Sequence, residues 1–262
     1  SSDAITKFHN LSLVTPDSRR GMFRRLLEIK KISRFIEAHS PISALIGENI
    51  SITKKGKNLT FDGFWSSSLT DSTSMGKPDN EYVDNTLRLK GINNIFDVTS
   101  KPLIFDGDTG GKKEHFDMKI RSIERLGISA VIIEDKTGLK KNSLHKNTSN
   151  QTQENADIFA EKISIGKKAQ SSDDFMIIAR IESFILNKDV KDAMRRAKKY
   201  VEAGADGIMI HSKSKKPNEV FSFSRQFRKL FKNIPLVGVP SSYNHVTEKQ
   251  LAQNGFNVVI YA

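Results

Sequence analysis

Three acidic residues at the ends of predicted strands have the chemistry to bind a divalent cation. Asp106 and Asp108 end the run KPLIFDGD, and Glu134 ends the run ISAVIIE. Residues two apart on a strand point the same way, so Asp106 and Asp108 share one direction. Carboxylates are hard oxygen ligands that suit Mg²⁺, and the chain has no cysteine that would favour a softer metal. The pattern predicts a Mg²⁺ site; the structural alternative is that Asp106 caps a turn and Glu134 pairs with Lys136.

Two basic residues at other strand ends have the chemistry to bind an anion. Arg180 follows the apolar run MIIA, and His211 ends the run DGIMIH. The planar fork of a buried arginine matches a carboxylate or a phosphoryl group. The alternatives are a structural ion pair between Arg180 and Glu182, and a His211 that is only hydrogen-bonded in place.

A polar segment follows the acidic strand end. It begins as EDKTGLKKNS, contains Lys140, Asn142 and Ser143, and stays polar to about residue 150. A long polar loop at the catalytic end of a barrel often closes over the substrate. We therefore predict a gating loop over residues 135–150, with an ordinary solvated loop as the alternative.

The elements that must position these residues alternate between strands and helices. Short apolar runs of this kind read as buried parallel strands, and the segments between them have helical periodicity. The predicted strands are Ser33–His39, Phe61–Ser66, Lys101–Asp108, Ile128–Glu134, Phe175–Ile181, Asp206–His211, Ile234–Pro240 and Asn257–Ala262. Eight such units predict a single (β/α)8 barrel domain over residues 1–262, with an open doubly wound sheet as the weaker alternative. Catalytic groups of a barrel lie at the C-terminal ends of its strands, where these polar residues fall.

Composition limits the class of protein. The chain of 262 residues has no cysteine, so disulfides, thiolate metal sites and a thiol nucleophile are excluded. No apolar run approaches the ~20 residues of a membrane span, and the N-terminus lacks the apolar core of a signal peptide. We therefore expect a cytoplasmic protein without a membrane partner. The formal charge of +12 leaves a nucleic-acid-binding protein as the alternative class, although the lysines are scattered and we expect no nucleic-acid partner.

Six segments in order carry a resemblance to a known family. They are WSSSLTDS, GKPD, DGDTGG, EDKTGLKKNS, IARIESF and DGIMIHS, and the similarity extends from about residue 35 to residue 262. Together they resemble the phosphoenolpyruvate phosphomutase family of the isocitrate lyase superfamily. The most specific element is Glu-Asp-Lys, five residues and then Asn-Ser. The resemblance implies a (β/α)8 barrel, Mg²⁺ as cofactor and conversion of phosphoenolpyruvate to phosphonopyruvate, the C–P bond formation that opens phosphonate biosynthesis.

The resemblance also implies roles for individual residues. The implied ligands of Mg²⁺, some of them through water, are Asp79, Asp106, Asp108 and Glu134. The implied substrate-binding residues, which hold the carboxylate or the phosphoryl group, are Trp65, Ser67, Ser68, Leu69 and Arg180. His211 would contact the phosphoryl group, and Lys140, Asn142 and Ser143 would act from the gating loop, with Asn142 beside the phosphorus. Phosphonopyruvate hydrolase, which breaks the C–P bond with water on the same scaffold, is the alternative activity; Asn142-Ser143 favours the phosphomutase.

Two departures from the family pattern concern segments of the chain. The segment Ser51–Thr60 looks like an insertion before the second strand, and we assign it no function. The chain stops after the eighth strand, where the family continues with a helix that is usually exchanged between partner barrels. We therefore expect that further residues follow in the natural protein, and that the full-length protein is a homo-oligomer, a dimer or a tetramer.

Overall fold

The structure is a computed structural model that describes residues 14–137 and 151–262. The helices are α2 (Pro16–Ile29), α3 (Pro41–Asn49), α4 (Ser68–Ser74), α5 (Asn85–Phe96), the short 3₁₀ helix η1 (Lys113–His115), α6 (Phe116–Arg125), α7 (Ala156–Ala169), α8 (Val190–Glu202), α9 (Asn218–Leu230) and α10 (Glu248–Gln253). The barrel strands are β1 (Ser33–Glu37), β4 (Gly63–Ser66), β5 (Leu103–Asp106), β6 (Ala130–Glu134), β9 (Met176–Ile181), β10 (Gly207–Ile210), β11 (Leu236–Gly238) and β12 (Val258–Tyr261). Two short hairpins add β2 (Ser51–Lys54) with β3 (Lys57–Thr60), and β7 (Lys136–Thr137) with β8 (Thr152–Gln153).

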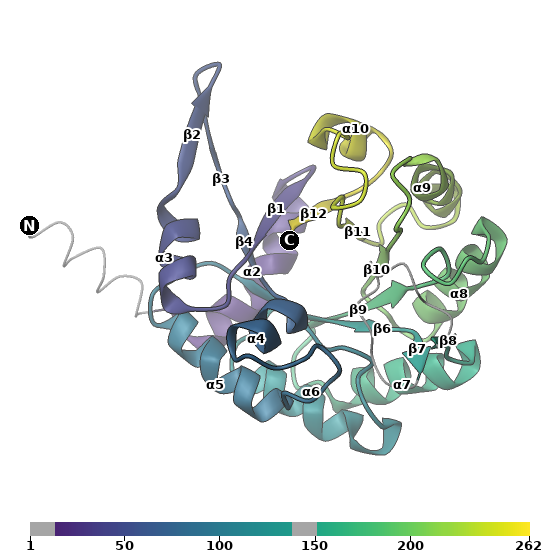
Figure 1. The fold of residues 1–262 in the computed structure, drawn as a ribbon, viewed down its shortest axis with the longest axis horizontal. Coiled ribbons are helices and arrows are strands. Elements are labelled where there is room, and N and C mark those ends of the chain that lie inside the picture. Colours follow the sequence, from purple (N-terminus) through teal and green to yellow (C-terminus); the bar gives the residue numbers. More distant parts are fainter. Residues whose placement is uncertain (1–13, 138–150) are drawn as a thin grey trace, which may run out of the picture.

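The eight barrel strands close on themselves in chain order, and every neighbouring pair is parallel. Figure 1 shows the helices arranged around the outside of this ring. Each of the eight strands lies within a segment that the sequence predicts as a strand. The predicted (β/α)8 barrel is therefore confirmed.

Two apolar layers follow from the alternation of side chains along each strand. On β9, Met176 and Ile178 belong to the cluster inside the barrel, whereas Ile177 and Ala179 belong to the cluster between strands and helices. This division explains why the strands read as continuous apolar runs: both faces are buried in a parallel barrel. The same alternation determines whether the side chain at the end of each strand points into the barrel or toward the helices.

Helix α2 packs against the N-terminal end of the barrel. Phe23 belongs to the interior cluster and meets Phe35 edge-on, with ring centroids 5.2 Å apart. The Arg19 guanidinium donates to the carbonyl oxygen of Lys101 at 2.8 Å and lies 4.2 Å from the ring centroid of Phe96. The N-terminal end of the barrel is thus closed by packed side chains and hydrogen bonds, and the C-terminal end is the open one.

The predicted insertion Ser51–Thr60 forms the hairpin β2–β3, which projects from the barrel in Figure 1. Its turn residues Lys55 and Gly56 have φ angles of 51° and 72°. Positive φ at both central positions is the type I′ geometry that matches the twist of a two-residue hairpin. Sequence analysis found the insertion but did not predict its hairpin.

Gly63 offers a test of packing inside the barrel. A Cβ atom at this position would lie 2.8 Å from the carbonyl oxygen of Pro102 and would overlap the buried ring of Phe35. Overpacking of this kind typically costs 1–3 kcal/mol, so Gly63→Ala should lower the free energy of unfolding by about 2–3 kcal/mol, measured by urea denaturation. The matched control is Gly91→Ala in α5, where a Cβ atom meets nothing within 4 Å. There the better helix propensity of alanine should raise stability by up to about 1 kcal/mol. Equal effects of the two substitutions would contradict the packing described.

Candidate active site

A pocket of about 250 Å³ opens at the C-terminal ends of the barrel strands. Its floor includes the interior residues Trp65, Met209 and Val239. Its polar lining comes from Glu37, Ser67, Ser68, Thr70, Asp79, Asp106, Arg180, His211 and Ser241. Candidate residues from four separate parts of the sequence therefore reach one cavity.

The period of two along a strand explains this convergence. Asp106 follows interior residue Ile104 by two positions, and Arg180 follows Ile178 in the same way. The pairs Ile132 and Glu134, Met209 and His211, Trp65 and Ser67, and Phe35 and Glu37 repeat the relation. On six of the eight barrel strands, the interior row of apolar side chains thus ends in a polar side chain at the rim; on β11 and β12 the positions that follow, Val239 and Ala262, are apolar.

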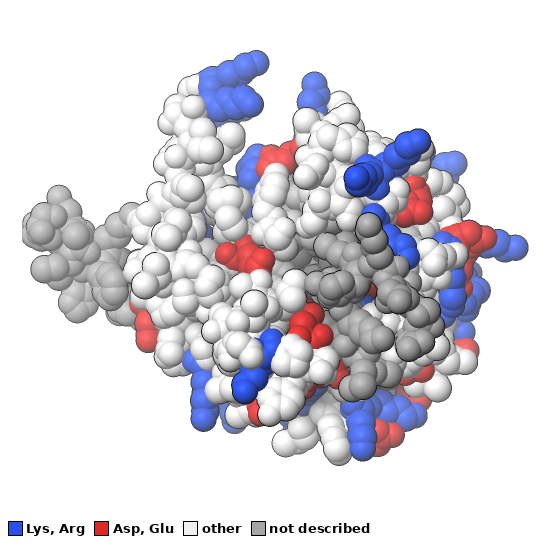
Figure 2. Space-filling model, viewed as in Figure 1, with Lys and Arg blue, Asp and Glu red and all other residues white. Residues whose placement is uncertain are grey.

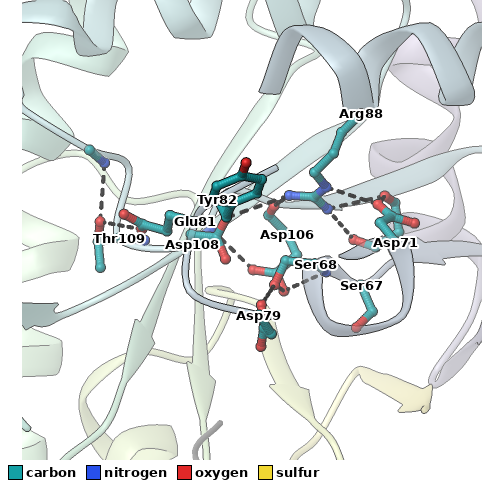
Figure 3. Close-up of polar contacts among 12 residues, drawn as sticks. Ser67, Ser68, Asp71, Asp79, Glu81, Tyr82, Arg88, Asp106, Asp108 and Thr109 are labelled. Carbon is teal, nitrogen blue, oxygen red and sulfur yellow. Dashed lines mark hydrogen bonds and ion pairs between the residues drawn. The ribbon is translucent and has the colours of Figure 1, made fainter. Parts of the chain in front are cut away.

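Asp106, Asp79 and Ser68 make up one wall of the pocket, shown in Figure 3. Asp106 Oδ2 accepts hydrogen bonds from the backbone N–H of Ser68 at 3.1 Å and from its hydroxyl at 2.8 Å. Asp79 Oδ1 lies 3.1 Å from the same hydroxyl. Because an oxygen of each carboxylate lies within 3.1 Å of the Ser68 hydroxyl oxygen, these two carboxylate oxygens lie less than about 6 Å apart. We call Asp79 and Asp106, with Ser68 between them, the acidic wall.

This wall fits Mg²⁺. The ion binds oxygen at 2.0–2.1 Å, keeps several waters and is usually held by one or two carboxylates, directly or through water. Among the described residues, no group of three or more Asp, Glu or His side chains is close enough to hold a metal ion by itself. Mg²⁺ needs no such group, because it can bind one or two carboxylates and fill its other coordination positions with water. The residues present therefore suit Mg²⁺ better than a cation whose ligands must all come from the protein.

Asp108 and Glu134, the other two predicted ligands, lie beside cations of the protein. Asp108 Oδ2 is 3.6 Å from Nη1 of Arg88, and its backbone has a φ angle of 54°. Glu134 is 1% exposed, with Oε1 3.5 Å from Nζ of Lys136 and Oε2 3.4 Å from Nη2 of Arg180. The ion pair between Glu134 and Lys136 is the structural alternative considered above. A contribution of either carboxylate to metal binding stays a prediction.

Arg180 and His211 also line the pocket and form what we call the basic wall. Burial acts to lower the pKa of Arg180, but Glu182, Glu134 and Asp106 outweigh it and raise that pKa above its ordinary value. Burial likewise opposes ionisation of Glu182, yet Arg180 holds the pKa of that carboxyl well below its usual range. Arg180 is therefore a permanent cation that is braced by the buried Glu182 and still reaches the pocket.

The surroundings of His211 favour its neutral form. Burial and the neighbouring charge of Arg180 both lower the pKa of its imidazole. Its Nδ1 lies 2.8 Å from Nη2 of Arg180 and 3.3 Å from Oε1 of Glu182. The shorter contact is to a guanidinium, which has only donors, and it favours Nδ1 as the acceptor. The ring proton is then on Nε2, which gives the basic wall a second donor for an anion.

The predicted gating loop falls largely outside the described residues, including Lys140, Asn142 and Ser143. Its two ends are described: β7 and β8 pair antiparallel, with Lys136 opposite Gln153. Asp135 fastens this stem, because its Oδ2 accepts from Gln153 Nε2 at 2.9 Å, Arg196 Nη1 at 3.1 Å and Tyr200 Oη at 2.7 Å. The described residues at the two ends of the predicted loop, Lys136–Thr137 and Thr152–Gln153, are therefore paired with each other directly after β6.

Comparison with known proteins identifies the family. The family model described as Phosphoenolpyruvate phosphomutase matches residues 23–262. The chain belongs to this family. The resemblance inferred from the sequence is thereby confirmed, and so is the expectation of an enzyme of the phosphomutase type, an isomerase.

Relatives of this phosphoenolpyruvate phosphomutase family match most of the chain. Phosphoenolpyruvate phosphomutase of Tetrahymena pyriformis is 34% identical over 91% of this chain and 76% of its own length. A crystal structure of phosphoenolpyruvate phosphomutase from Streptomyces platensis subsp. rosaceus has a TM-score of 0.83 and 34% identity, over 92% of this chain and 79% of that one. Phosphonopyruvate hydrolase in complex with oxalate and Mg²⁺ has a TM-score of 0.80 and 31% identity, over 93% and 80%. Similarity alone therefore does not separate the phosphomutase from the hydrolase.

Three polar residues of the pocket, Glu37, Thr70 and Ser241, were not predicted from the sequence, nor was Arg88 behind it. Glu37 ends β1 and lines the pocket, and its Oε1 is buried with no hydrogen bond from the described residues. Burial raises the pKa of Glu37, and Asp71 and Asp106 raise it further. The alternation that places Asp106 and Arg180 at the rim would have found Glu37 as well. Arg88 lies on a helix, outside that pattern, and had no such signal.

The surface adds little to the nucleic-acid alternative. On the face seen in Figure 2, lysines and arginines are spread around the edge, with one group at the tip of the β2–β3 hairpin. That tip carries Lys54, Lys55 and Lys57. Within the described ranges, no helix combines the length and the apolar character needed to cross a membrane.

Proposed function

We propose that the protein is a Mg²⁺-dependent phosphoenolpyruvate phosphomutase, which moves the phosphoryl group of phosphoenolpyruvate from oxygen to carbon and so forms phosphonopyruvate. The observation that carries this proposal is that an acidic wall and a basic wall line one pocket. Asp79 and Asp106 offer anionic oxygens, and Arg180 and His211 offer donors. A substrate with both a metal-binding enol oxygen and a phosphoryl group needs both walls at once.

The basic wall would bind the phosphoryl group. Phosphoryl transfer passes through a loose transition state, so the protein contributes mainly position and charge stabilisation. The Arg180 guanidinium and the Nε2–H of His211 supply donors that stay in place while the O–P bond breaks and the C–P bond forms. Glu182 and Glu134 hold the guanidinium, which reduces the reorganisation needed during the reaction.

The loop at the start of α4 would bind the substrate carboxylate. Ser67, Ser68 and Leu69 all line the pocket at the N-terminus of that helix. Backbone N–H groups at the start of a helix attract a carboxylate, and the N–H of Ser68 already donates to Asp106. The hydroxyl of Ser68 is already bonded to Asp106 and Asp79, so we assign the carboxylate contact to Ser67 and to backbone N–H groups. Trp65 would supply an apolar surface for the planar enol.

Asp106 and Asp79, with Asp108 and Glu134 through water, would hold Mg²⁺. When bound, the ion supplies the positive charge that stabilises the enolate left when the phosphoryl group departs. The residues of the chain then have two further tasks: to keep the phosphoryl group on the basic wall while the enolate presents its carbon, and to keep water out. We assign the second task to the gating loop with Lys140, Asn142 and Ser143.

Phosphorus NMR with phosphonopyruvate as substrate tests the proposal. A phosphomutase converts it to phosphoenolpyruvate, and the reaction stops when Mg²⁺ is removed with EDTA. Appearance of inorganic phosphate and pyruvate instead would show the hydrolase, for which relatives of similar identity exist. No conversion at all, with or without Mg²⁺, would contradict both activities and leave a non-enzymatic role, including nucleic-acid binding.

Substitution of Asn142 tests the role of the loop. We expect Asn142→Ala to lower kcat by at least about a thousandfold while the free energy of unfolding stays unchanged, because the amide is proposed to act only on the transferring phosphorus. The same NMR assay measures the rate, and urea denaturation measures stability. Asn147→Ala in the same segment is the matched control and should keep the wild-type rate. A near-wild-type rate for Asn142→Ala would refute the assignment.

Three expectations accompany this function. Cytoplasmic location, homo-oligomeric assembly of the full-length protein and the absence of a nucleic-acid partner stay predictions.

A further inference from the structure

Arg88 is a buried arginine that does not line the pocket and that the proposed reaction does not use. It lies on α5, its side chain is 1% exposed, and its guanidinium stacks 4.2 Å from the ring centroid of Phe105. Burying a charge is costly unless it is paired and hydrogen-bonded. Its position therefore has to be explained by its partners.

The partners of Arg88 come from the two strand ends that carry the acidic wall, as Figure 3 shows. Nη1 donates to the backbone carbonyl oxygen of Asp106 at 2.5 Å, at the end of β5. Nη2 donates to the carbonyl oxygen and the hydroxyl of Ser66 at 3.1 and 3.2 Å, at the end of β4. Nε donates to Asp71 at 2.9 Å, on α4. The planar guanidinium of Arg88 thus links β4, α4 and β5 through hydrogen bonds.

This bracing acts on both sides of the acidic wall. Ser66 and Asp71 flank the turn that presents the N–H and hydroxyl of Ser68 to Asp106. Nη1 also lies 3.6 Å from Oδ2 of Asp108. Arg88 therefore links the Asp106 backbone to the residue that precedes the Ser67–Ser68 turn, and it also lies beside Asp108.

We propose that Arg88 is a positioning residue for the divalent cation: it fixes Asp106 and Asp108 in the arrangement that binds Mg²⁺ and touches neither the ion nor the substrate. This inference rests on the proposed function, since it requires the acidic wall to be the metal site. Groups that orient metal ligands typically change metal affinity 10–100-fold when they are replaced. Lysine keeps the charge of Arg88 but cannot reproduce its fork.

The test is metal affinity, measured with Mn²⁺ alone by electron paramagnetic resonance titration of the full chain. We expect Arg88→Lys to raise the Kd for Mn²⁺ at least about tenfold. Arg19 provides a matched control, because it is also 2% exposed and also stacks 4.2 Å from a phenylalanine ring, but at the other end of the barrel. Arg19→Lys should lower the melting temperature similarly and leave the Kd unchanged.

A second variant covers the case in which Arg88→Lys does not fold. The pair Arg88→Met with Asp71→Leu replaces a buried ion pair by apolar side chains, an exchange that is often neutral for stability. It should fold and still show the raised Kd. A Kd within twofold of wild type in the folded variant would overturn the role of Arg88.

The outcome for the wild type separates this inference from the proposed function. If wild-type protein binds Mn²⁺ and Asp106→Ala weakens that binding, the metal site stands, and the Arg88 variants then decide the positioning role. If wild-type protein binds no Mn²⁺, or if Asp106→Ala binds it equally well, the metal site of the proposed function is wrong and the role of Arg88 falls with it.

Discussion

Asp106→Ala should lower kcat/KM for phosphonopyruvate by about a thousandfold. A metal ion supplies several kcal/mol of transition-state stabilisation, and about 4 kcal/mol corresponds to a factor of about a thousand. Asp106 is the only one of the four predicted ligands that both ends a barrel strand and lines the pocket. Its loss should also raise the Mg²⁺ concentration needed for half-maximal rate.

Steady-state kinetics at several Mg²⁺ concentrations measure both effects of Asp106→Ala. Asp97→Ala is the control, because Asp97 is an exposed carboxylate at the end of α5, outside the pocket. It should leave the rate and the Mg²⁺ dependence as they are. If Asp106→Ala behaved like this control, the acidic wall would have no part in catalysis.

Arg180→Lys should lower kcat/KM by about 100-fold to 1000-fold, the usual cost of one lost donor to a transition-state oxyanion. Lysine is preferred to an apolar replacement because Glu134 and Glu182 are buried beside Arg180. Removing their shared cation would cost about 3–5 kcal/mol of stability and confuse the result. A lysine keeps a charge there but loses the planar fork.

The control for Arg180→Lys is Arg24→Lys. Arg24 pairs with Asp206 at 2.7 Å, away from the pocket. This exchange should affect stability slightly and kcat/KM not at all. Thermal unfolding of both variants separates folding from catalysis, and a folded Arg180→Lys variant with kcat/KM within twofold of wild type would mean that another group binds the phosphoryl oxygens.

Much of the fold could be predicted because one rule operates at every strand. Apolar runs with helical segments between them favour a parallel barrel. The period of two then places Asp106, Arg180 and His211 at the pocket and Glu134 at the end of β6. The boundaries were less accurate. The predicted strand Lys101–Asp108 is shortened to Leu103–Asp106, because Asp108 turns into the left-handed region and the backbone leaves the sheet.

The contacts within the site could not be read from the sequence. The role of Ser68 in substrate binding stays a prediction, but no pattern indicated that its hydroxyl would lie 2.8 Å from Asp106 and 3.1 Å from Asp79. The fork of Arg88 joins residues 17 to 22 positions away, on two strands and a helix. Such networks depend on how α4 and α5 pack over β4 and β5, and no local pattern encodes that packing.

The most direct test of the central claim is a crystal structure of the protein soaked with Mg²⁺ and oxalate. The account predicts one ion bound to the Asp106 carboxylate at about 2.0–2.1 Å, with oxalate between the ion and the basic wall of Arg180 and His211. An ion bound elsewhere, or oxalate in the pocket without any ion near Asp106 and Asp79, would contradict it.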